Sequence, residues 1–359
     1  MSSRRLFLAG GMAALRPRRA SAQEDPVLAD HLRALMVQHR VPAASVALIR
    51  NGALAERVTP GADPDTLFQA ASISKVVAGQ VILHLVDRGD IDLDRPVNDV
   101  LRSWKLPGTQ AAAVTPRLLL GHRAGTNVPG FPGYMGGAPL PDLRQILDGA
   151  SPANTPAVRV EWEPGRAFRY SGGGTMVLQQ LAIDVARRTF AALAADLVLK
   201  PAAMSRSSFA QPLPRSESNA ASAHDLEGRP LPGKFHVYPE LAAAGLWSSA
   251  TDLARLALAI SASWRDGAML SRPLARTMAH RLADGPSGLG IFVQPQSGRA
   301  PLLYHYGVNA GFRSVLTFVA DGSFGLALMT NGEGGRALIP AFCGGIFAAN
   351  GQGSVPPID

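Results

Sequence analysis

The chain has little cysteine, lysine or charge, and each shortage excludes a class of protein. Cys343 is the single cysteine among 359 residues, so no internal disulfide can form, and we expect this thiol to be a small buried side chain. No apolar run reaches the 18 residues typical of a membrane-spanning helix. With 47% hydrophobic and 17% charged residues, the composition is globular, and the length allows one large or two ordinary domains.

The formal net charge of +8 gives no support for a nucleic-acid partner. Five of the positive charges come from arginines within residues 1–22, a stretch without acids. The rest of the chain shows no basic stripe with interleaved aromatic residues, which nucleic-acid binding would need. We therefore expect a small-molecule substrate and no nucleic acid.

Residues 1–22 resemble a bacterial twin-arginine export signal. Arg4 and Arg5 precede a short apolar run, and an Ala-Ser-Ala cleavage pattern ends at Ala22. The apolar run is short and the basic cluster that follows it is dense, so a basic tail is the alternative. The signal predicts a periplasmic or secreted protein that begins near Gln23 and keeps no membrane anchor.

The pattern of elements predicts an α+β fold with an antiparallel sheet built from both chain ends. We expect one domain over residues 23–359, with the sheet in about 26–75 and 235–350 and a mainly helical insertion in about 76–234. Asn51-Gly52 is typical of a type I′ hairpin turn. Strands are expected at 45–50, 53–58, 289–294, 302–306, 314–320 and 324–330. Helices are expected at 26–40, 75–88 (starting near Ser72), 115–121, 142–148, 174–190, 191–199, 251–264, 272–281 and 335–348.

Ser72 and Lys75 are the strongest chemical signal in the chain. Their spacing puts a nucleophile and an amine on one face of a helix start, where unpaired backbone N–H groups favour a developing oxyanion. A buried lysine can lose its proton near neutral pH and act as a base. Taken alone, the pattern also fits a capping serine beside a surface lysine.

The scarcity of lysine favours the catalytic interpretation. The chain has four lysines, and arginine supplies nearly all other basic charge. Arginine stays protonated and could not replace Lys75 as a base. Metal, P-loop and Gly-x-Ser-x-Gly motifs are missing from the sequence, so we expect no metal and no cofactor.

Three further segments carry candidate site residues. Tyr170 precedes a glycine run that feeds a helix, and a hydroxyl there can relay protons. His305 and Gly307 alternate on a strand, where the glycine would let a ligand backbone approach. We interpret His122, at a helix end, as scaffold.

Together these segments resemble the serine hydrolases related to class C β-lactamases, D-alanyl-D-alanine carboxypeptidases and family VIII esterases. Ser72-Ile-Ser-Lys75 resembles the nucleophile motif, Tyr170-Ser-Gly172 the Tyr-x-Asn motif, and His305-Tyr-Gly307 the Lys/His-x-Gly motif. The segment from Ala244 to Leu253 is similar to a common family segment. The likeness spans about residues 26–348.

The resemblance implies an acyl-enzyme mechanism. Ser72 would attack a carbonyl while Lys75 and Tyr170 share the proton transfers, with Lys75 favouring a phenolate on Tyr170. The backbone N–H groups of Ser72 and Val308 would hold the oxyanion. Gly172, His305 and Gly307 would contact the substrate.

Two departures from the family pattern affect the substrate. Gly172 replaces an asparagine that commonly binds a substrate amide, so Gly172→Asn is expected to improve amide or β-lactam acylation. His305 replaces a lysine and supplies a hydrogen bond instead of a fixed charge.

The sequence leaves an ester, amide, peptide or β-lactam substrate open and favours an ester. It also leaves open a catalytically inactive member of the fold that acts as a binding module, and it sets no oligomeric state.

Overall fold

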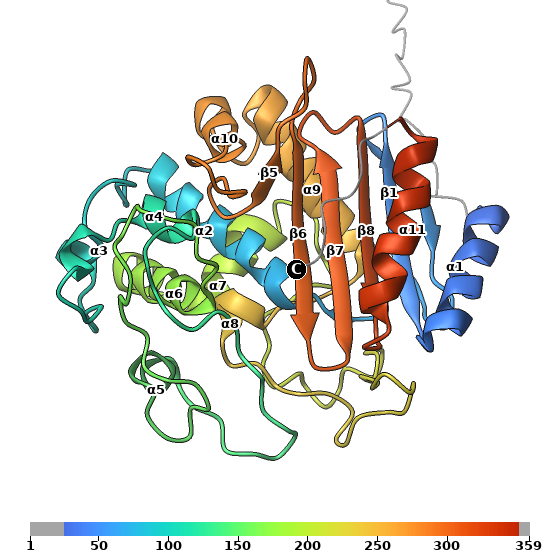
Figure 1. The fold of residues 1–359 in the computed structure, drawn as a ribbon, viewed down its shortest axis with the longest axis horizontal. Coiled ribbons are helices and arrows are strands. Elements are labelled where there is room, and N and C mark those ends of the chain that lie inside the picture. Colours follow the sequence, from blue (N-terminus) through green and yellow to red (C-terminus); the bar gives the residue numbers. More distant parts are fainter. Residues whose placement is uncertain (1–24, 352–359) are drawn as a thin grey trace, which may run out of the picture.

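The computed structural model describes residues 25–351 and centres on a six-stranded antiparallel sheet (Figure 1). The strand order is β2-β1-β8-β7-β6-β5, so strands from the two chain ends meet at the β1–β8 pair. A separate two-stranded ladder joins β3 to β4. The strands are β1 Ala44–Arg50, β2 Ala53–Val58, β3 Phe68–Gln69, β4 Trp247–Ser248, β5 Phe292–Gln294, β6 Leu302–Asn309, β7 Phe312–Val319 and β8 Phe324–Thr330.

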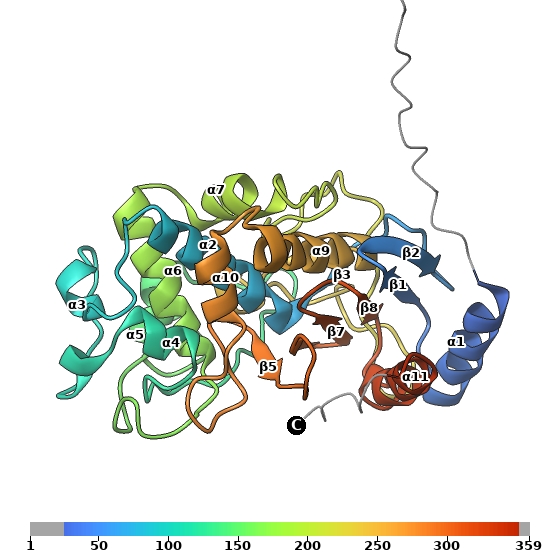
Figure 2. The same ribbon diagram turned by 90° about the horizontal axis from the view of Figure 1, so that it is seen from above.

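Helices cover both faces of the sheet, and a further group of helices lies beside one edge (Figure 2). α1 and α11 pack on one face, and α9 packs on the other. The helices are α1 Pro26–His39, α2 Ser74–Asp87, α3 Val97–Val100, α4 Pro116–Leu120, α5 Leu143–Asp148, α6 Gly172–Ala186, α7 Phe190–Ala194, α8 Leu241–Ala244, α9 Ala250–Asp266, α10 Arg272–Met278 and α11 Gly335–Ala349. The short turns are η1 Ala71–Ile73, η2 Ala111–Ala113 and η3 Ala195–Leu199.

Strand β1 shows why the sheet is buried on both faces. Its side chains alternate, so that Val46 and Leu48 join the core beneath α1 and α11. Ala47 and Ile49 join the larger core on the opposite face. An antiparallel sheet with helices on both sides therefore shows apolar residues at nearly every position of its central strands.

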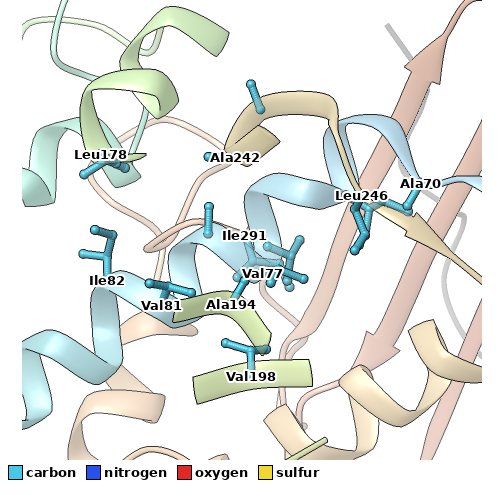
Figure 3. Packing of buried hydrophobic residues seen from close by; sticks show 14 of the residues in the cluster. Ala70, Val77, Val81, Ile82, Leu178, Ala194, Val198, Ala242, Leu246 and Ile291 are labelled. Carbon is cyan, nitrogen blue, oxygen red and sulfur yellow. The ribbon is translucent and has the colours of Figure 1, made fainter. Parts of the chain in front are cut away.

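Helix α2 is almost completely buried, which fixes the start of the helix in space. Val77, Val81 and Ile82 pack among side chains from α6, α8 and η3 (Figure 3). The turn η1, which leads into α2, packs against β6 and β7. The apolar run that follows Lys75 in the sequence is thus the anchor of the candidate site.

Most predicted elements are confirmed, with small changes of boundary. Asn51 and Gly52 both have positive φ, 50° and 75°, as a type I′ turn requires. The helix predicted near Ser72 begins with the 3₁₀ turn η1 before α2 starts at Ser74. The expected strand at 289–294 is shorter, Phe292–Gln294, and the expected helix at 272–281 ends at Met278.

Five short elements were not predicted, namely β3, β4, α3, α8 and η2, because two to four residues carry too little periodicity. The predicted export signal lies outside the described residues, and the boundaries of the helical insertion stay a prediction. Cys343 is buried, as expected, and burial raises the pKa of its thiol to about 12.

Across residues 25–351, every helix is too short or too polar to cross a membrane.

Candidate functional site

Ser72 and Lys75 meet at the start of α2. Lys75 Nζ donates a hydrogen bond to Ser72 Oγ at 3.0 Å. Ser72 lies in η1 and is half-buried, whereas Lys75 is only 4% exposed. The hydroxyl therefore faces the surface while the amine lies behind it, an arrangement that suits a nucleophile and its base.

The surroundings of Lys75 favour a neutral amine. Besides Ser72, Nζ donates to the backbone oxygen of Ala243 in α8 at 2.8 Å. Neither partner carries a charge that would hold an ammonium ion. Burial lowers the pKa of Lys75 from 10.5 to about 7. A substantial share of the molecules therefore carries an unprotonated amine near neutral pH.

Tyr170 stands immediately before the capping residue of α6 and faces the same pair. Its ring centroid is 5.0 Å from Lys75 Nζ. Burial raises the pKa of the phenol above its usual value of 10, and a hydrogen bond with Ser72 opposes this shift only in part. Because burial penalises the charged form, the surroundings of Tyr170 favour the protonated phenol over the phenolate that the resemblance implied.

His305 lies in β6 with its ring stacked on Phe292, the centroids 4.8 Å apart. Its Nδ1 is 2.7 Å from the Tyr306 carbonyl oxygen, which can only accept, so Nδ1 carries the proton. Nε2 is then an acceptor, buried and without a hydrogen-bond partner among the described residues. Burial, aided by the charge on Lys75, lowers the pKa of His305 to about 3, so the ring stays neutral.

Gly307 is required by a close contact within the protein itself, and its expected contact with a ligand stays a prediction. A Cβ at this position would lie 2.2 Å from the Ala70 backbone oxygen and 2.1 Å from Ser314 Oγ. The close approach is made by the protein's own segment before Ser72, because η1 packs directly against β6. This packing sets η1, which contains Ser72, against the strand that contains Val308, a residue that is 51% exposed.

Gly172 is the first residue of α6, and its surroundings change the expectation for Gly172→Asn. A Cβ there would lie 2.9 Å from Phe131 Cε2 and 3.2 Å from the Pro129 backbone oxygen. Phe131 is half-buried and occupies the direction that a side chain at position 172 would take. A single Gly172→Asn change therefore has no room unless the Phe131 ring moves.

His122, interpreted from the sequence as scaffold, lies beside Tyr170 in the structure. The Ser171 backbone N–H donates to its Nδ1 at 3.2 Å, and its ring is 4.5 Å from the Tyr170 ring. Burial, with smaller contributions from the charge on Lys75 and from His305, lowers its pKa well below the usual value. The neutral ring therefore holds the backbone that presents Tyr170.

Sequence reasoning missed a polar network beneath the site. Asn309 Nδ2 donates to Gln69 Oε1 at 2.8 Å and to the Ala244 backbone oxygen at 3.2 Å. It ties β6 and β3 to α8, the element that also holds Lys75 through Ala243. The three residues lie 65 to 240 positions apart, so no local pattern could have revealed the contact.

Three residues near the site have a left-handed backbone: Ala71, next to Ser72, has φ of 52°, His122 has 54°, and Val128 has 58°, while six other non-glycine residues with positive φ lie elsewhere in residues 25–351. Such values are unusual for residues with a side chain, and most of all for a β-branched one.

Within residues 25–351, no group of three or more His, Cys, Asp and Glu residues could hold a metal ion.

Comparisons with known proteins agree with this geometry. A family model described as Beta-lactamase matches residues 28–340. Penicillin-binding protein 4 of Amycolatopsis lactamdurans is 33% identical over 101 residues, which is 26% of this chain and 26% of that protein. The match therefore spans about a quarter of the length of that relative.

Three solved structures show a similar fold. An octameric penicillin-binding protein homologue from Pyrococcus abyssi has a TM-score of 0.73 at 23% identity, covering 91% of this chain and 77% of its own. A D-stereospecific amidohydrolase from a Streptomyces species has a TM-score of 0.68 at 21% identity, covering 89% and 99%. D-alanine carboxypeptidase AmpC from Burkholderia cenocepacia has a TM-score of 0.69 at 19% identity, also covering 89% and 99%.

At these identities the solved structures show the fold alone, and the family model supplies the assignment. The sheet joined by both chain ends, the helices on its two faces and the meeting of Ser72, Lys75 and Tyr170 fit the resemblance carried by the sequence motifs. The chain belongs to the Beta-lactamase family and has its β-lactamase/transpeptidase-like α+β fold.

Proposed function

We propose that this protein is a serine hydrolase that cleaves uncharged carboxylic esters through an acyl-enzyme on Ser72. The observation that carries the proposal is the buried Lys75 amine, 3.0 Å from Ser72 Oγ and with a pKa of about 7. A lysine held this way costs stability, and catalysis is the use that explains it.

In acylation, the neutral Lys75 amine takes the proton of Ser72 as Oγ attacks the ester carbonyl carbon. The carbonyl oxygen becomes an oxyanion, for which the backbone N–H groups of Ser72 and Val308 are the expected donors. Tyr170, which keeps its proton, donates it to the departing alkoxide as the C–O bond breaks. The Lys75 ammonium ion then restores the proton of Tyr170.

In deacylation, a water molecule takes the place of the alcohol. The neutral Lys75–Tyr170 pair removes its proton, the new hydroxyl attacks the acyl carbon, and Ser72 leaves with a proton. The carboxylic acid is released, and Lys75 is ready for another turnover.

The preference for an uncharged ester follows from two positions. His305 presents an acceptor at Nε2 instead of a donor, which does not suit a substrate carboxylate. Phe131 fills the space beside Gly172, so no side-chain amide can meet a substrate amide there. An uncharged ester needs neither a donor for a carboxylate nor a side-chain amide. An amide, peptide or β-lactam substrate would lose one or both of these contacts.

Intact mass spectrometry of residues 23–359 tests the proposal. The wild-type protein and Ser72→Ala would each be exposed to a fluorophosphonate and, separately, to penicillin G. We expect an adduct with the fluorophosphonate that Ser72→Ala lacks, together with Ser72-dependent hydrolysis of p-nitrophenyl acetate.

Other outcomes would redirect the assignment. A Ser72-dependent penicillin G adduct would move the substrate towards the penicillin-recognising branch. No adduct with either reagent and no ester turnover would contradict the proposal and revive the inactive binding module.

A further inference from the structure

A cavity of about 340 Å³ adjoins Tyr170 on the side of the loop before α6. Its volume falls at the small end of the range typical of ligand sites. It is lined by Thr126, Asn127, Val128, Pro129, Trp162, Phe168, Arg169 and Tyr170. Tyr170 therefore belongs both to the lining of the cavity and to the candidate site, where its ring centroid lies 5.0 Å from Lys75 Nζ.

The polar groups of the lining already have partners inside the protein. Thr126 Oγ1 donates to Ser171 Oγ at 3.0 Å. Asn127 Nδ2 donates to the Ala157 backbone oxygen at 2.9 Å, and its Oδ1 accepts from the Arg159 backbone N–H at 2.9 Å. These groups are engaged away from a ligand, so what remains to meet one is mainly apolar.

The wall next to Tyr170 is also rigid. Pro129 and Val128 give their backbone oxygens to the N–H groups of Gly172 and Gly173, at 3.1 and 2.9 Å. Val128 holds a left-handed φ of 58°, a strained state for a β-branched residue that persists only when its surroundings impose it. Such a wall is formed before any ligand binds.

Trp162 gives the lining of the cavity a partly exposed aromatic surface that a ligand could cover. It is 39% exposed, and the Arg169 guanidinium stacks over its ring at 4.5 Å. The stack holds a large apolar surface at the rim in one orientation. Covering that surface with a hydrocarbon chain would be favourable, at roughly 25 cal/mol per Å² of apolar area.

From this geometry we infer that the cavity lined by Val128, Pro129, Trp162, Phe168 and Tyr170 binds the hydrocarbon chain of the ester substrate. The inference rests on the proposed function and narrows it to esters with an apolar chain of medium length. Either the acyl or the alcohol part of the ester could supply that chain, and the experiment separates the two.

Two substrate series test the inference. The first varies the acyl chain of p-nitrophenyl esters from acetate to octanoate, and the second varies the alcohol of alkyl acetates from ethyl to octyl. We expect kcat/KM to rise at least about tenfold with chain length in one series. Trp162→Ala should reduce the ratio of long-chain to short-chain kcat/KM by about tenfold, and Trp162→Phe by less.

Trp264→Ala is the matched control, because Trp264 is also partly buried and stacked beneath an arginine, Arg276, at 4.8 Å. It should keep the wild-type chain-length ratio. Equal labelling of Ser72 by a fluorophosphonate would show that each variant is folded.

The failure of this inference differs from the failure of the proposed function. Turnover of short esters with no chain-length dependence in either series, or a dependence that Trp162→Ala leaves intact, would overturn the cavity assignment alone. No Ser72-dependent turnover of any ester would overturn the proposed function.

Discussion

Two helices, α2 and α6, begin at the candidate site, and they differ in how their N-termini are capped. At η1 and α2, the N-cap residue Ile73 makes no side-chain hydrogen bond. At α6, the Ser171 hydroxyl accepts from the Gly174 N–H at 2.9 Å, and backbone oxygens of the preceding loop serve the two residues before it. We call the start of η1 and α2, which lacks a side-chain cap, the open start, and the capped start of α6 the closed start.

The difference separates the two tasks of the site. The start of α2 holds a half-buried hydroxyl and a buried amine without an acid, which suits chemistry. The start of α6 fixes Tyr170 through a dense set of hydrogen bonds around Ser171, which suits positioning. In the sequence, the glycine run and the Ser-x-x-Lys pattern both predict a helix start. Only the structure shows which of the two N-termini is capped.

Removing the Lys75 amine from the open start should reduce activity more than any other change. We expect Lys75→Ala to reduce kcat/KM for p-nitrophenyl acetate by at least about 10³-fold, because Ser72 loses its base. Lys75→Arg should lose as much, since arginine stays protonated. Lys200→Ala, which removes an exposed lysine paired with Asp196, is the control and should lie within about twofold of wild type. A near-normal rate for Lys75→Ala would eliminate Lys75 as the base.

The pH dependence of kcat/KM should follow the deprotonation of Lys75 at the open start. Burial lowers the pKa of Lys75 to about 7, so the unprotonated base is lost as the pH falls. We expect kcat/KM to fall about tenfold per pH unit below pH 7 and to level off above it. His305, with a pKa of about 3, adds no further step near neutrality. Rates measured from pH 5 to 11 would reveal the midpoint; a midpoint near pH 10 would contradict the buried neutral amine.

Replacing the amine by an apolar side chain should stabilise the fold. Between pH 7 and 10.5 the unfolded chain binds the Lys75 proton while the folded chain does not, so stability rises with pH across this window. Lys75→Met removes this cost and should raise the free energy of unfolding at pH 7 by about 1–3 kcal/mol, although Ala243 loses a donor. The gain should shrink towards pH 10.5. Urea unfolding at both pH values, with Lys200→Met as control, measures it.

A side chain at position 172 should disturb the closed start. We expect Gly172→Asn to cost about 1–3 kcal/mol of stability, because its Cβ meets Phe131. The double variant Phe131→Ala/Gly172→Asn should recover part of that cost, and it alone should gain activity on p-nitroacetanilide relative to the matching ester. Phe131→Ala is the control for the lost ring. If Gly172→Asn alone gains amide turnover, Phe131 does not set the substrate preference.

Removing the cap should have the smallest effect. Ser171→Ala leaves the Gly174 N–H and the Asn127 backbone oxygen without their partner, and we expect a loss of about 1–2 kcal/mol. Ser249→Ala at the start of α9 removes a comparable cap on a different helix and should cost about 1 kcal/mol. Ser171→Ala should also lower kcat, since Tyr170 is adjacent. Thermal unfolding and kcat, measured on both variants, distinguish a cap that positions Tyr170 from one that only stabilises.

The sequence predicted the family fold, the strands of both chain ends and the grouping of Ser72, Lys75 and Tyr170, because periodicity and local motifs carry that information. It could not predict the phenol's protonation, since burial of Tyr170 depends on side chains from distant elements. It also missed that Gly307 serves contact with Ala70 and that Phe131 stands against Gly172. These contacts join residues far apart in the chain, where a pattern of neighbours has no signal.

Because β1 pairs with β8, the sheet can be completed only late in synthesis. Ala44 pairs with Thr330, and the segment before Ser72 is held by Gly307 and Ser314. During synthesis, the nucleophile is therefore made early but acquires its supporting wall only after more than two hundred further residues have emerged. A nascent chain, or one cut before β6, would carry the Ser-x-x-Lys motif without the platform beneath it. We therefore expect labelling of Ser72 by a fluorophosphonate to require a chain that has been made and folded at least through β8.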